Sequence, residues 1–213
     1  MTDPSSDDCT ESLDLVRRAQ GGEEGALNRL LERYYERVHR IVRFRLGRDL
    51  RNHLESLDIL QDTFIEAVRA FDRFEMRDES SLIHWLSLIA EHRIKGAADY
   101  HHARKRDDRK DVRLMRDDAD ASTIFVIDPP ASARQPIEQL VEEERFEVVE
   151  ACMDELGLDQ REVIIQRNFT GASWEDIAER IGSPSPDAAR MLYARAITEL
   201  ARLVNRHEGQ RRR

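Results

Sequence analysis

The sequence has few residues that interrupt helices and no long apolar run. Its 213 residues include 9 glycines and 6 prolines, and no stretch alternates polar and apolar residues as a half-buried strand would. This composition favours an all-helical protein. A transmembrane helix needs about 18 consecutive apolar residues, and none are found. The polar segment from Met1 to Glu11 also lacks the apolar core of a signal peptide. We therefore expect a cytoplasmic protein with no membrane insertion.

Cysteine is scarce, and histidine forms no ligand pattern. Cys9 and Cys152 make neither a CxxC motif nor a disulfide framework, which suits a reducing compartment. The 7 histidines show no HExxH or Cys/His spacing. Neither a Gly-rich phosphate loop nor a nucleophile elbow is present. We therefore expect no metal site, no cofactor and no catalytic residue, so an enzyme is not predicted.

Charge is acidic in sum but unevenly distributed. The formal net charge is -9, which argues against a protein that binds DNA unaided, because phosphate neutralisation supplies much of DNA affinity. Basic residues nevertheless gather between Arg93 and Arg113 and at the C-terminus, and acidic ones gather between Glu138 and Glu155. Local basic stripes on an acidic chain suggest DNA contact that needs help from a partner.

Apolar periodicity predicts helices in both halves of the chain. The N-terminal half predicts a short helix and three longer ones, the last capped by Ser80 or Ser81. The C-terminal half predicts two helices, the second capped by Asp159, followed by a further helix pair. The expected ranges are 13–19, 25–46, 56–71, 81–106, 138–156 and 159–168. Between Asp107 and Gln135 periodicity fails and prolines cluster, which indicates a linker.

The final helix pair, within Phe169 to Leu200, has the form of a helix-turn-helix. Ser173 and Asp176 form a capping-box-like start. Gly182 ends the first helix, and Ser185 with Pro186 suits the start of the second. The second helix buries Ala189, Leu192, Tyr193, Ala196 and Leu200 and turns Arg190 and Arg195 outward. Such a helix can enter the major groove, although helix pairs joined by tight turns also occur in bundles that bind no DNA.

Four segments together resemble the bacterial RNA polymerase sigma factors of the extracytoplasmic-function (ECF) type. "SWEDIAERIG…AARMLYARAITEL" and the preceding "LGLDQREVIIQRNFTGAS" look like region four, which reads the upstream, minus-thirty-five element. "LDILQDTFIEAVRAFDRFE" is similar to the part of region two that grips the polymerase clamp. "SSLIHWLSLIAEHRIKGAADYHHARKR" is similar to the part that melts the promoter and reads the minus-ten element. The resemblance extends from about Leu13 to Val204.

The resemblance implies an all-α fold of two small helical domains joined by a flexible linker. It implies a disordered tail over 1–12, a region-2-like domain over 13–106, a linker over 107–136, a region-4-like helix-turn-helix domain over 137–205 and a basic tail over 206–213. The implied partners are core RNA polymerase and promoter DNA, with an anti-sigma factor as a regulatory partner. All chemistry would belong to the polymerase.

The resemblance also assigns three sets of residues by position. The polymerase-binding set is Asp58, Gln61, Asp62 and Glu66. The minus-ten and melting set is Arg77, Ser80, His84, Arg93, Lys95, Tyr100, His101 and Arg104. The upstream-element set is Ser185, Arg190 and Arg195. Aromatic and basic groups suit the second set, because it would hold a flipped base and track a displaced strand.

Two features depart from the family pattern. The family often has Asp-Ala-Glu-Asp before the clamp helix, whereas this chain has Glu-Ser-Leu-Asp from Glu55 to Asp58, with one carboxylate fewer. Phosphorylation of Ser56 or Thr63 by a kinase would restore negative charge. The turn from Ser183 to Pro186 is one residue longer than usual. The alternatives left open are a helix-turn-helix regulator that acts on duplex DNA without polymerase and a helical adaptor of the anti-sigma type.

Overall fold

All regular structure in the described residues is helical, as the sequence predicts. A computed structural model describes residues 4–76, 79–106 and 136–211. The N-terminal part contains α1 (Pro4–Gln20), α2 (Glu24–Arg51), α3 (Ser56–Ala70), the 3-10 turn η1 (Phe71–Arg73) and α4 (Glu79–Arg106). The C-terminal part contains α5 (Pro136–Glu155), α6 (Leu158–Ile165), the π-helical turn η2 (Gln166–Thr170), α7 (Trp174–Arg180) and α8 (Pro186–Arg211). None of these helices combines the length and apolarity needed to cross a membrane.

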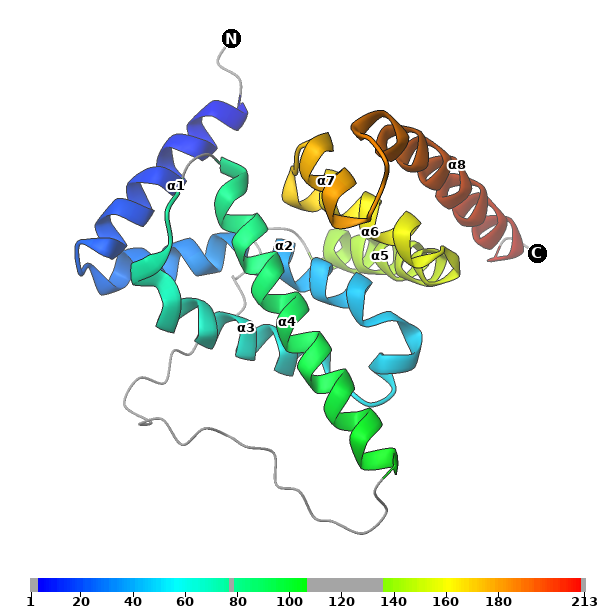
Figure 1. Cartoon of the computed structure of the whole chain (residues 1–213), viewed down its shortest axis with the longest axis horizontal. Helices are drawn as coiled ribbons and strands as arrows, with labels where there is room; N and C mark the ends of the chain where they lie inside the picture. The colour runs from blue at the N-terminus through cyan, green and yellow to red at the C-terminus, as the bar shows by residue number, and fades with distance from the viewer. Residues whose placement is uncertain (1–3, 77–78, 107–135, 212–213) are drawn as a thin grey trace.

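Helix α2 is the centre of the N-terminal part. The other three helices of this part pack against it, with α4 crossing in front of α2 in Figure 1. Most of the apolar positions predicted from periodicity become buried, but Leu57, predicted within the buried stripe of α3, is 53% exposed. The most deeply buried members are Leu30, Leu31, Val38, Ile41 and Val42 of α2, Leu60 and Phe64 of α3, and Leu82 and Leu86 of α4. These stripes therefore fix which face each helix turns inward.

Three helix boundaries in the N-terminal part differ from the sequence-based prediction. Helix α1 begins at Pro4 rather than Leu13, so the predicted disordered tail is largely helical; proline suits a first helical position. Helix α4 begins at Glu79, which puts the predicted caps Ser80 and Ser81 inside its first turn. Helix α2 continues beyond Leu46 after a kink at Gly47, where φ is 60° and ψ is 168°.

Two predictions for the C-terminal part also need correction. Gly157, not Asp159, is the N-cap of α6, and its backbone N–H donates to Gln160 Oε1 at 3.1 Å. Asp159 lies in the first turn, where its charge favours the helix dipole. Helix α8 does not end near Asn205 but runs to Arg211. Its last turns are tied back to α5 by His207 Nε2, which lies 3.0 Å from Glu155 Oε1.

The two helical parts pack against each other through α2. Helices α5 and α6 lie along α2, and η2 contacts α4 (Figure 1). Phe44 of α2 is 2% exposed, with its ring 5.0 Å from that of Phe146 and 5.2 Å from that of Phe169. The segment 107–135, interpreted above as a linker, lies outside the described residues. Within the described chain, one continuous apolar core therefore spans both parts.

Candidate nucleic-acid interface

Helices α7 and α8 form the predicted helix-turn-helix with the predicted caps. Ser173 Oγ accepts a hydrogen bond from Asp176 N–H at 3.1 Å and donates one to Asp176 Oδ2 at 2.6 Å. Gly182 has a φ of 65°, a left-handed conformation that glycine adopts without strain. Ser185 Oγ accepts from Ala188 N–H at 3.1 Å, and α8 starts at Pro186. The angle at which α8 leaves the turn is therefore set by local hydrogen bonds.

Helix α8 has one buried face and one exposed face. Ala189, Ala196 and Leu203 are buried against α5, α6 and α7. Arg190 and Arg195 are both exposed, and at about 100° per residue they lie roughly 140° apart around the helix. Between them lie exposed Met191, at 63% exposure, and Ala194. The two arginines therefore mark the edges of an exposed face whose centre carries Met191 and Ala194 and, at its N-terminal end, the exposed carboxylate of Asp187.

Trp174 holds the Arg190 side chain in place. The Arg190 guanidinium lies 5.7 Å from the centre of the Trp174 ring, and that of Arg167 lies 4.7 Å from it. Arg190 Nη1 also donates to Asp187 Oδ1 at 2.7 Å. Trp174 lies on the apolar stripe of α7, which favours a core position, but it is only half-buried and contacts Tyr193 edge-on. Its apolar stripe gave no sign of this second contact with arginine.

The candidate polymerase-binding residues share one face of α3. Asp58, Gln61 and Asp62 are exposed. Exposed Leu57, at 53%, and Ile65, at 38%, lie on the same side of the helix. The face combines carboxylates with apolar side chains, a mixture suited to a protein partner with basic groups around an apolar centre.

Glu66, the fourth member of that set, is engaged within the molecule. It forms an ion pair with Arg93 of α4, a residue that the resemblance assigns to the melting set. The structure therefore brings together two residues that the sequence assigned to different surfaces. Each side chain is about one third exposed, with 34% for Glu66 and 37% for Arg93.

The candidate melting residues do not occupy a single face of α4. His84 and Lys95 lie on one side, and Arg93 and Tyr100 lie on roughly the opposite side, as about 100° per residue requires. His101 stacks on His53 with 5.8 Å between ring centres. Arg77 lies outside the described residues, and the side chains of Ser80 and Arg104 are not described.

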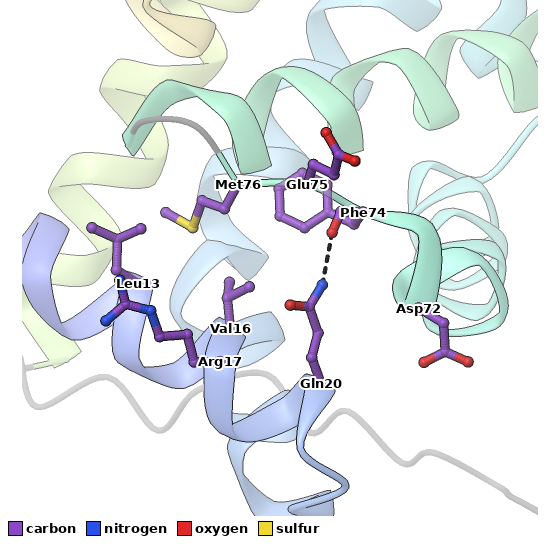
Figure 2. Close-up of a pocket in the computed structure, with 8 residues that line it drawn as sticks. All are labelled: Leu13, Val16, Arg17, Gln20, Asp72, Phe74, Glu75 and Met76. Carbon is purple, nitrogen blue, oxygen red and sulfur yellow. Dashed lines mark hydrogen bonds between the residues drawn. The ribbon is translucent and has the colours of Figure 1, made fainter.

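A hollow of about 650 Å³ opens beside the segment that joins α3 to α4. Figure 2 shows Gln20 of α1 pointing across it, with Nε2 donating to the Phe74 carbonyl at 2.7 Å. The Phe74 ring packs on Trp85, with 4.8 Å between centres. Met76 and Val16 also line the hollow. Gln20 carries no recognisable signal in the sequence, because a lone polar residue at a helix end is not part of a periodic pattern.

The two candidate phosphorylation sites differ in accessibility. Thr63 is fully buried, and its hydroxyl donates to the Ile59 carbonyl at 2.7 Å. A kinase would reach it only after α3 opened locally. Ser56 is half-buried at the start of α3, with its hydroxyl 3.2 Å from His39 Nε2.

Comparison with known proteins gives matches along most of the chain. Residues 30–107 match the Sigma-70 region 2 family. The ECF RNA polymerase sigma-E factor of Escherichia coli (strain K12) is 30% identical over 174 residues, which cover 80% of this chain and 82% of that protein. The ECF RNA polymerase sigma factor BldN of Streptomyces coelicolor is 27% identical over 204 residues, covering 94% of this chain and 69% of BldN.

One solved structure, that of an RsbN–BldN complex, is 23% identical and covers 88% of this chain and 98% of the matched chain, with a TM-score of 0.31. The family is shown instead by the sequence matches, namely the region 2 match and the 30% identity to the Escherichia coli sigma-E factor over 80% of this chain. The chain therefore belongs to the family of ECF RNA polymerase sigma factors, which direct transcription initiation by RNA polymerase at promoter DNA and are not themselves enzymes.

Proposed function

We propose that α8 reads the upstream promoter element with the face bounded by Arg190 and Arg195. The observation that carries this proposal is the exposure of that face at the second helix of a capped helix-turn-helix. Arginine can bond a guanine edge with two hydrogen bonds or neutralise a phosphate. Met191 and Ala194 offer apolar contact of the kind that suits a thymine methyl group. Ser185 lies at the N-terminal end of α8, where it would meet the DNA backbone.

The proposal gives α3 the role of binding the polymerase clamp through Asp58, Gln61 and Asp62. Their exposure supports this assignment. Exposed carboxylates speed encounter with a basic partner, while the adjacent Leu57 and Ile65 can be buried on contact. Because Glu66 is already paired with Arg93, it would support this surface from behind rather than meet the polymerase directly.

Helix α4 and the hollow beside Phe74 would serve promoter opening. Lys95 is exposed on α4 and can follow a phosphate backbone. His84, Tyr100 and His101 add rings on which unpaired bases can stack. In this proposal 13–106 forms the region-2-like domain and 137–205 the region-4-like domain.

Regulation by a kinase or an anti-sigma factor is a further part of the proposal. Ser56 is the acceptor that its position favours, since it precedes Asp58 at the start of α3 and is partly exposed. A phosphate there would add negative charge at a helix N-terminus beside the proposed clamp surface. An anti-sigma factor would act by covering the face of α3 or that of α8.

The test is run-off transcription with bacterial core RNA polymerase on the promoter upstream of the gene for this protein. We expect transcripts only when the protein is added, and their loss in the Arg190→Ala, Arg195→Ala variant. The matched control is Arg202→Ala, which removes an exposed arginine about 18 Å from Arg190 and about 10 Å from Arg195 along α8. Full transcription by the double variant would refute the role of α8. Binding of duplex promoter DNA without polymerase would favour a stand-alone regulator.

A further inference from the structure

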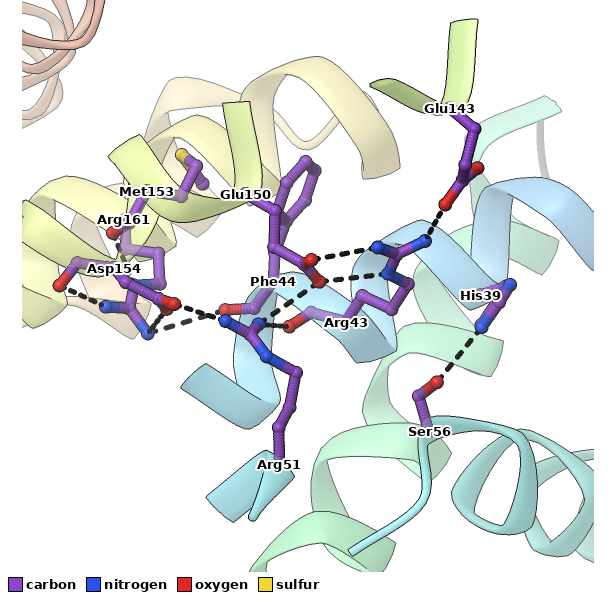
Figure 3. Close-up of polar contacts among 10 residues, drawn as sticks. All are labelled: His39, Arg43, Phe44, Arg51, Ser56, Glu143, Glu150, Met153, Asp154 and Arg161. Atoms are coloured by element: carbon purple, nitrogen blue, oxygen red, sulfur yellow. Dashed lines mark hydrogen bonds and ion pairs between the residues drawn. The ribbon is translucent and has the colours of Figure 1, made fainter. Parts of the chain in front are cut away.

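The arginines of the chain differ in how much of each guanidinium is already bonded. Figure 3 shows Arg43 of α2 with both ends of its guanidinium engaged. Its Nε and Nη2 lie 2.9 and 2.8 Å from the two carboxylate oxygens of Glu150, and its Nη1 lies 2.6 Å from Glu143 Oε1. Arg51 of α2 likewise pairs with Glu150 and Asp154. Arginines bonded in this way have little left to offer a nucleic acid.

Arg190 of α8 is bonded on one side only. Its Nη1 donates to Asp187 Oδ1 at 2.7 Å, and its guanidinium lies 5.7 Å from the centre of the Trp174 ring. No described residue accepts a hydrogen bond from its Nε or Nη2. The side chain of Arg190 is 52% exposed and that of Asp187 is 84% exposed. The edge formed by Nε and Nη2 is therefore open to a ligand.

The Asp187 carboxylate determines which ligand suits that edge. It balances the charge of Arg190 and repels a phosphate, so the pair contributes little to binding the DNA backbone. The remaining N–H groups can still donate two parallel hydrogen bonds to O6 and N7 of guanine, the specific contact that arginine makes most often in the major groove. A paired arginine with one open edge is therefore better suited to read guanine than to neutralise phosphate.

The Trp174 ring that stacks on this guanidinium is itself held in place. Tyr193 contacts the ring edge-on, with 5.5 Å between ring centres, and its hydroxyl donates to Asn168 Oδ1 at 2.8 Å. The Arg167 guanidinium lies 4.7 Å from the same ring and donates to the Ala172 carbonyl at 3.0 Å. The indole is thus fixed by contacts with α8 and η2. A guanidinium stacked on a fixed ring loses less rotamer entropy when it binds a base.

Arg195 lies in a different position on the same helix. It follows Arg190 by five residues, which is about 7.5 Å further along the axis. Its Nε donates to the Met191 carbonyl of its own helix at 3.3 Å. In helix-turn-helix proteins the N-terminal residues of the second helix meet the base edges. Arg190 lies within the first two turns of α8 and Arg195 lies beyond them, where a cation suits a phosphate at the edge of the groove.

We infer that Arg190 reads a guanine of the upstream element, and that Asp187 and Trp174 are positioning residues for its guanidinium. Arg195 instead binds a phosphate of the DNA backbone. The inference rests on the proposed function of α8 and adds a division of roles between its two arginines. It also requires the upstream element to contain a guanine opposite Arg190.

The experiment measures base preference and affinity separately, with the full-length chain bound to core RNA polymerase. Duplex promoters with a randomised upstream element are selected by gel shift and sequenced, which gives the base preference at each position. Binding to a promoter with a scrambled upstream element is then measured over a range of salt concentrations. Thermal denaturation verifies that each variant is folded. The variants are Arg190→Ala, Arg195→Ala, Asp187→Asn, Trp174→Phe and Trp174→Leu. The matched control is Arg202→Ala, because Arg202 also pairs with a carboxylate three residues away, that of Glu199.

The two arginine variants should differ in kind. We expect Arg190→Ala to reduce the preference for guanine at one position by roughly tenfold, with little change in the salt dependence of binding. Arg195→Ala should weaken binding to all sequences alike and reduce the slope of log affinity against log salt by about 1. Arg202→Ala should change neither quantity. If Arg190→Ala lost affinity equally on all sequences with a reduced salt slope, Arg190 would be a phosphate ligand and the inference would be overturned.

The positioning residues have a signature that a loss of stability does not produce. Asp187→Asn should lower the guanine preference by roughly threefold, because the charge-assisted bond is weakened, yet strengthen binding to the scrambled promoter, because a carboxylate that repels phosphates is gone. Trp174→Phe keeps a ring face and should retain most of the guanine preference. Trp174→Leu keeps apolar volume without a ring and should lower that preference by roughly threefold. Equal preferences in the two Trp174 variants would overturn the role of the ring, and an unchanged preference in Asp187→Asn would overturn that of the carboxylate.

Failure of the inference and failure of the proposed function give different results. If the wild-type protein bound to polymerase showed no base preference in the upstream element, the proposed function of α8 would fail and the inference with it. If the wild type showed a preference that Arg190→Ala retained in full, the inference alone would fail, and α8 would read the promoter through other residues.

Discussion

Glu66 of α3 and Arg93 of α4 form an ion pair across the N-terminal part. The pair connects the helix proposed to bind polymerase with the helix proposed to contact the minus-ten region. A change at either residue therefore acts on both surfaces, and a transcription defect at Arg93 does not by itself indicate contact with DNA.

The first prediction concerns this pair. Glu66→Gln and Arg93→Ala should each lower the free energy of unfolding by about 0.5–1 kcal/mol, as expected for a partly exposed pair. The double variant should lose less free energy of unfolding than the two single variants lose together, because the ion pair is already absent after the first change. Urea denaturation measures the free energy of unfolding of the two single variants and the double variant. Lys95→Ala, an exposed cation on the same helix, is the control and should change stability by under about 0.5 kcal/mol. Additive losses would mean that the pair does not form in solution.

The second prediction concerns the aromatic centre between the halves. Phe44→Ala should lower the free energy of unfolding by about 3–5 kcal/mol, because it removes a buried ring that contacts Phe146 and Phe169. Phe44→Leu keeps more apolar volume and should therefore lose clearly less free energy of unfolding than Phe44→Ala. Leu158→Ala is the control, since Leu158 is 81% exposed and should matter little. A small loss in Phe44→Ala would show that the two halves do not pack in solution.

The third prediction tests the cap of α7. Ser173→Ala should lower the free energy of unfolding by about 1 kcal/mol, because the Asp176 N–H loses its acceptor. Ser173→Asp should retain most of the stability, since a carboxylate also caps a helix. Thermal denaturation followed by circular dichroism measures the stability of each variant relative to the wild type. Thr198→Ala is the control, because that exposed hydroxyl bonds only to the Ala194 carbonyl of its own helix. Equal losses for Ser173→Ala and Ser173→Asp would contradict a capping role.

The fourth prediction concerns pH. Burial lowers the pKa of His39, and the neighbouring Arg43 lowers it further, although Glu36, Glu143 and Glu150 oppose the shift. A histidine whose pKa is lower in the folded state stabilises the fold above its unfolded pKa of about 6.5, and that stability is lost as pH falls below it. Wild-type protein should therefore lose more stability between pH 7.5 and pH 5.5 than His39→Gln does. The free energy of unfolding is measured by urea denaturation at each pH. If it fell equally with pH in the wild type and in His39→Gln, the lowered pKa would be refuted.

The fifth prediction concerns the kink in α2. Gly47 has φ 60° and ψ 168°, a region open almost only to glycine, and an added Cβ would lie 2.9 Å from Arg161 Nη1. Gly47→Ala should therefore cost about 1–3 kcal/mol. Gly209→Ala on α8 is the control, because nothing lies near its position. Combining Gly47→Ala with Arg161→Ala should not restore stability, since the backbone strain remains. Full recovery of stability in the double variant would mean that the loss comes from crowding between the added Cβ and Arg161 rather than from backbone strain.

Local features were predictable from the sequence because they depend on neighbours along the chain. The caps at Ser173 and Ser185 follow from side chains that bond backbone groups three residues away. The buried stripes of α2 and α3 follow from helical spacing. The outward direction of Arg190 and Arg195 follows from the apolar positions on the opposite side of the helix, such as Ala189, Leu192 and Ala196. These predictions needed no knowledge of what lies across the core.

Long-range pairings could not be predicted in this way. Arg43 and Glu150 are separated by 107 positions, and the chain has 34 basic and 43 acidic residues from which such pairs could be drawn. The choice depends on how α5 packs along α2, which no local pattern encodes. The resemblance likewise assigned Glu66 and Arg93 to separate surfaces by position and gave no sign that they meet.

The internal pairing of the α2 arginines also affects how the free protein behaves near the chromosome. Cations that face carboxylates inside the molecule cannot neutralise phosphates or release counterions, which is the main source of affinity for random-sequence DNA. With a formal net charge of -9, the protein should bind such DNA weakly. A genome offers roughly a million or more competing non-specific sites. Weak binding to them would keep the free protein in solution, where it can encounter polymerase before it encounters DNA.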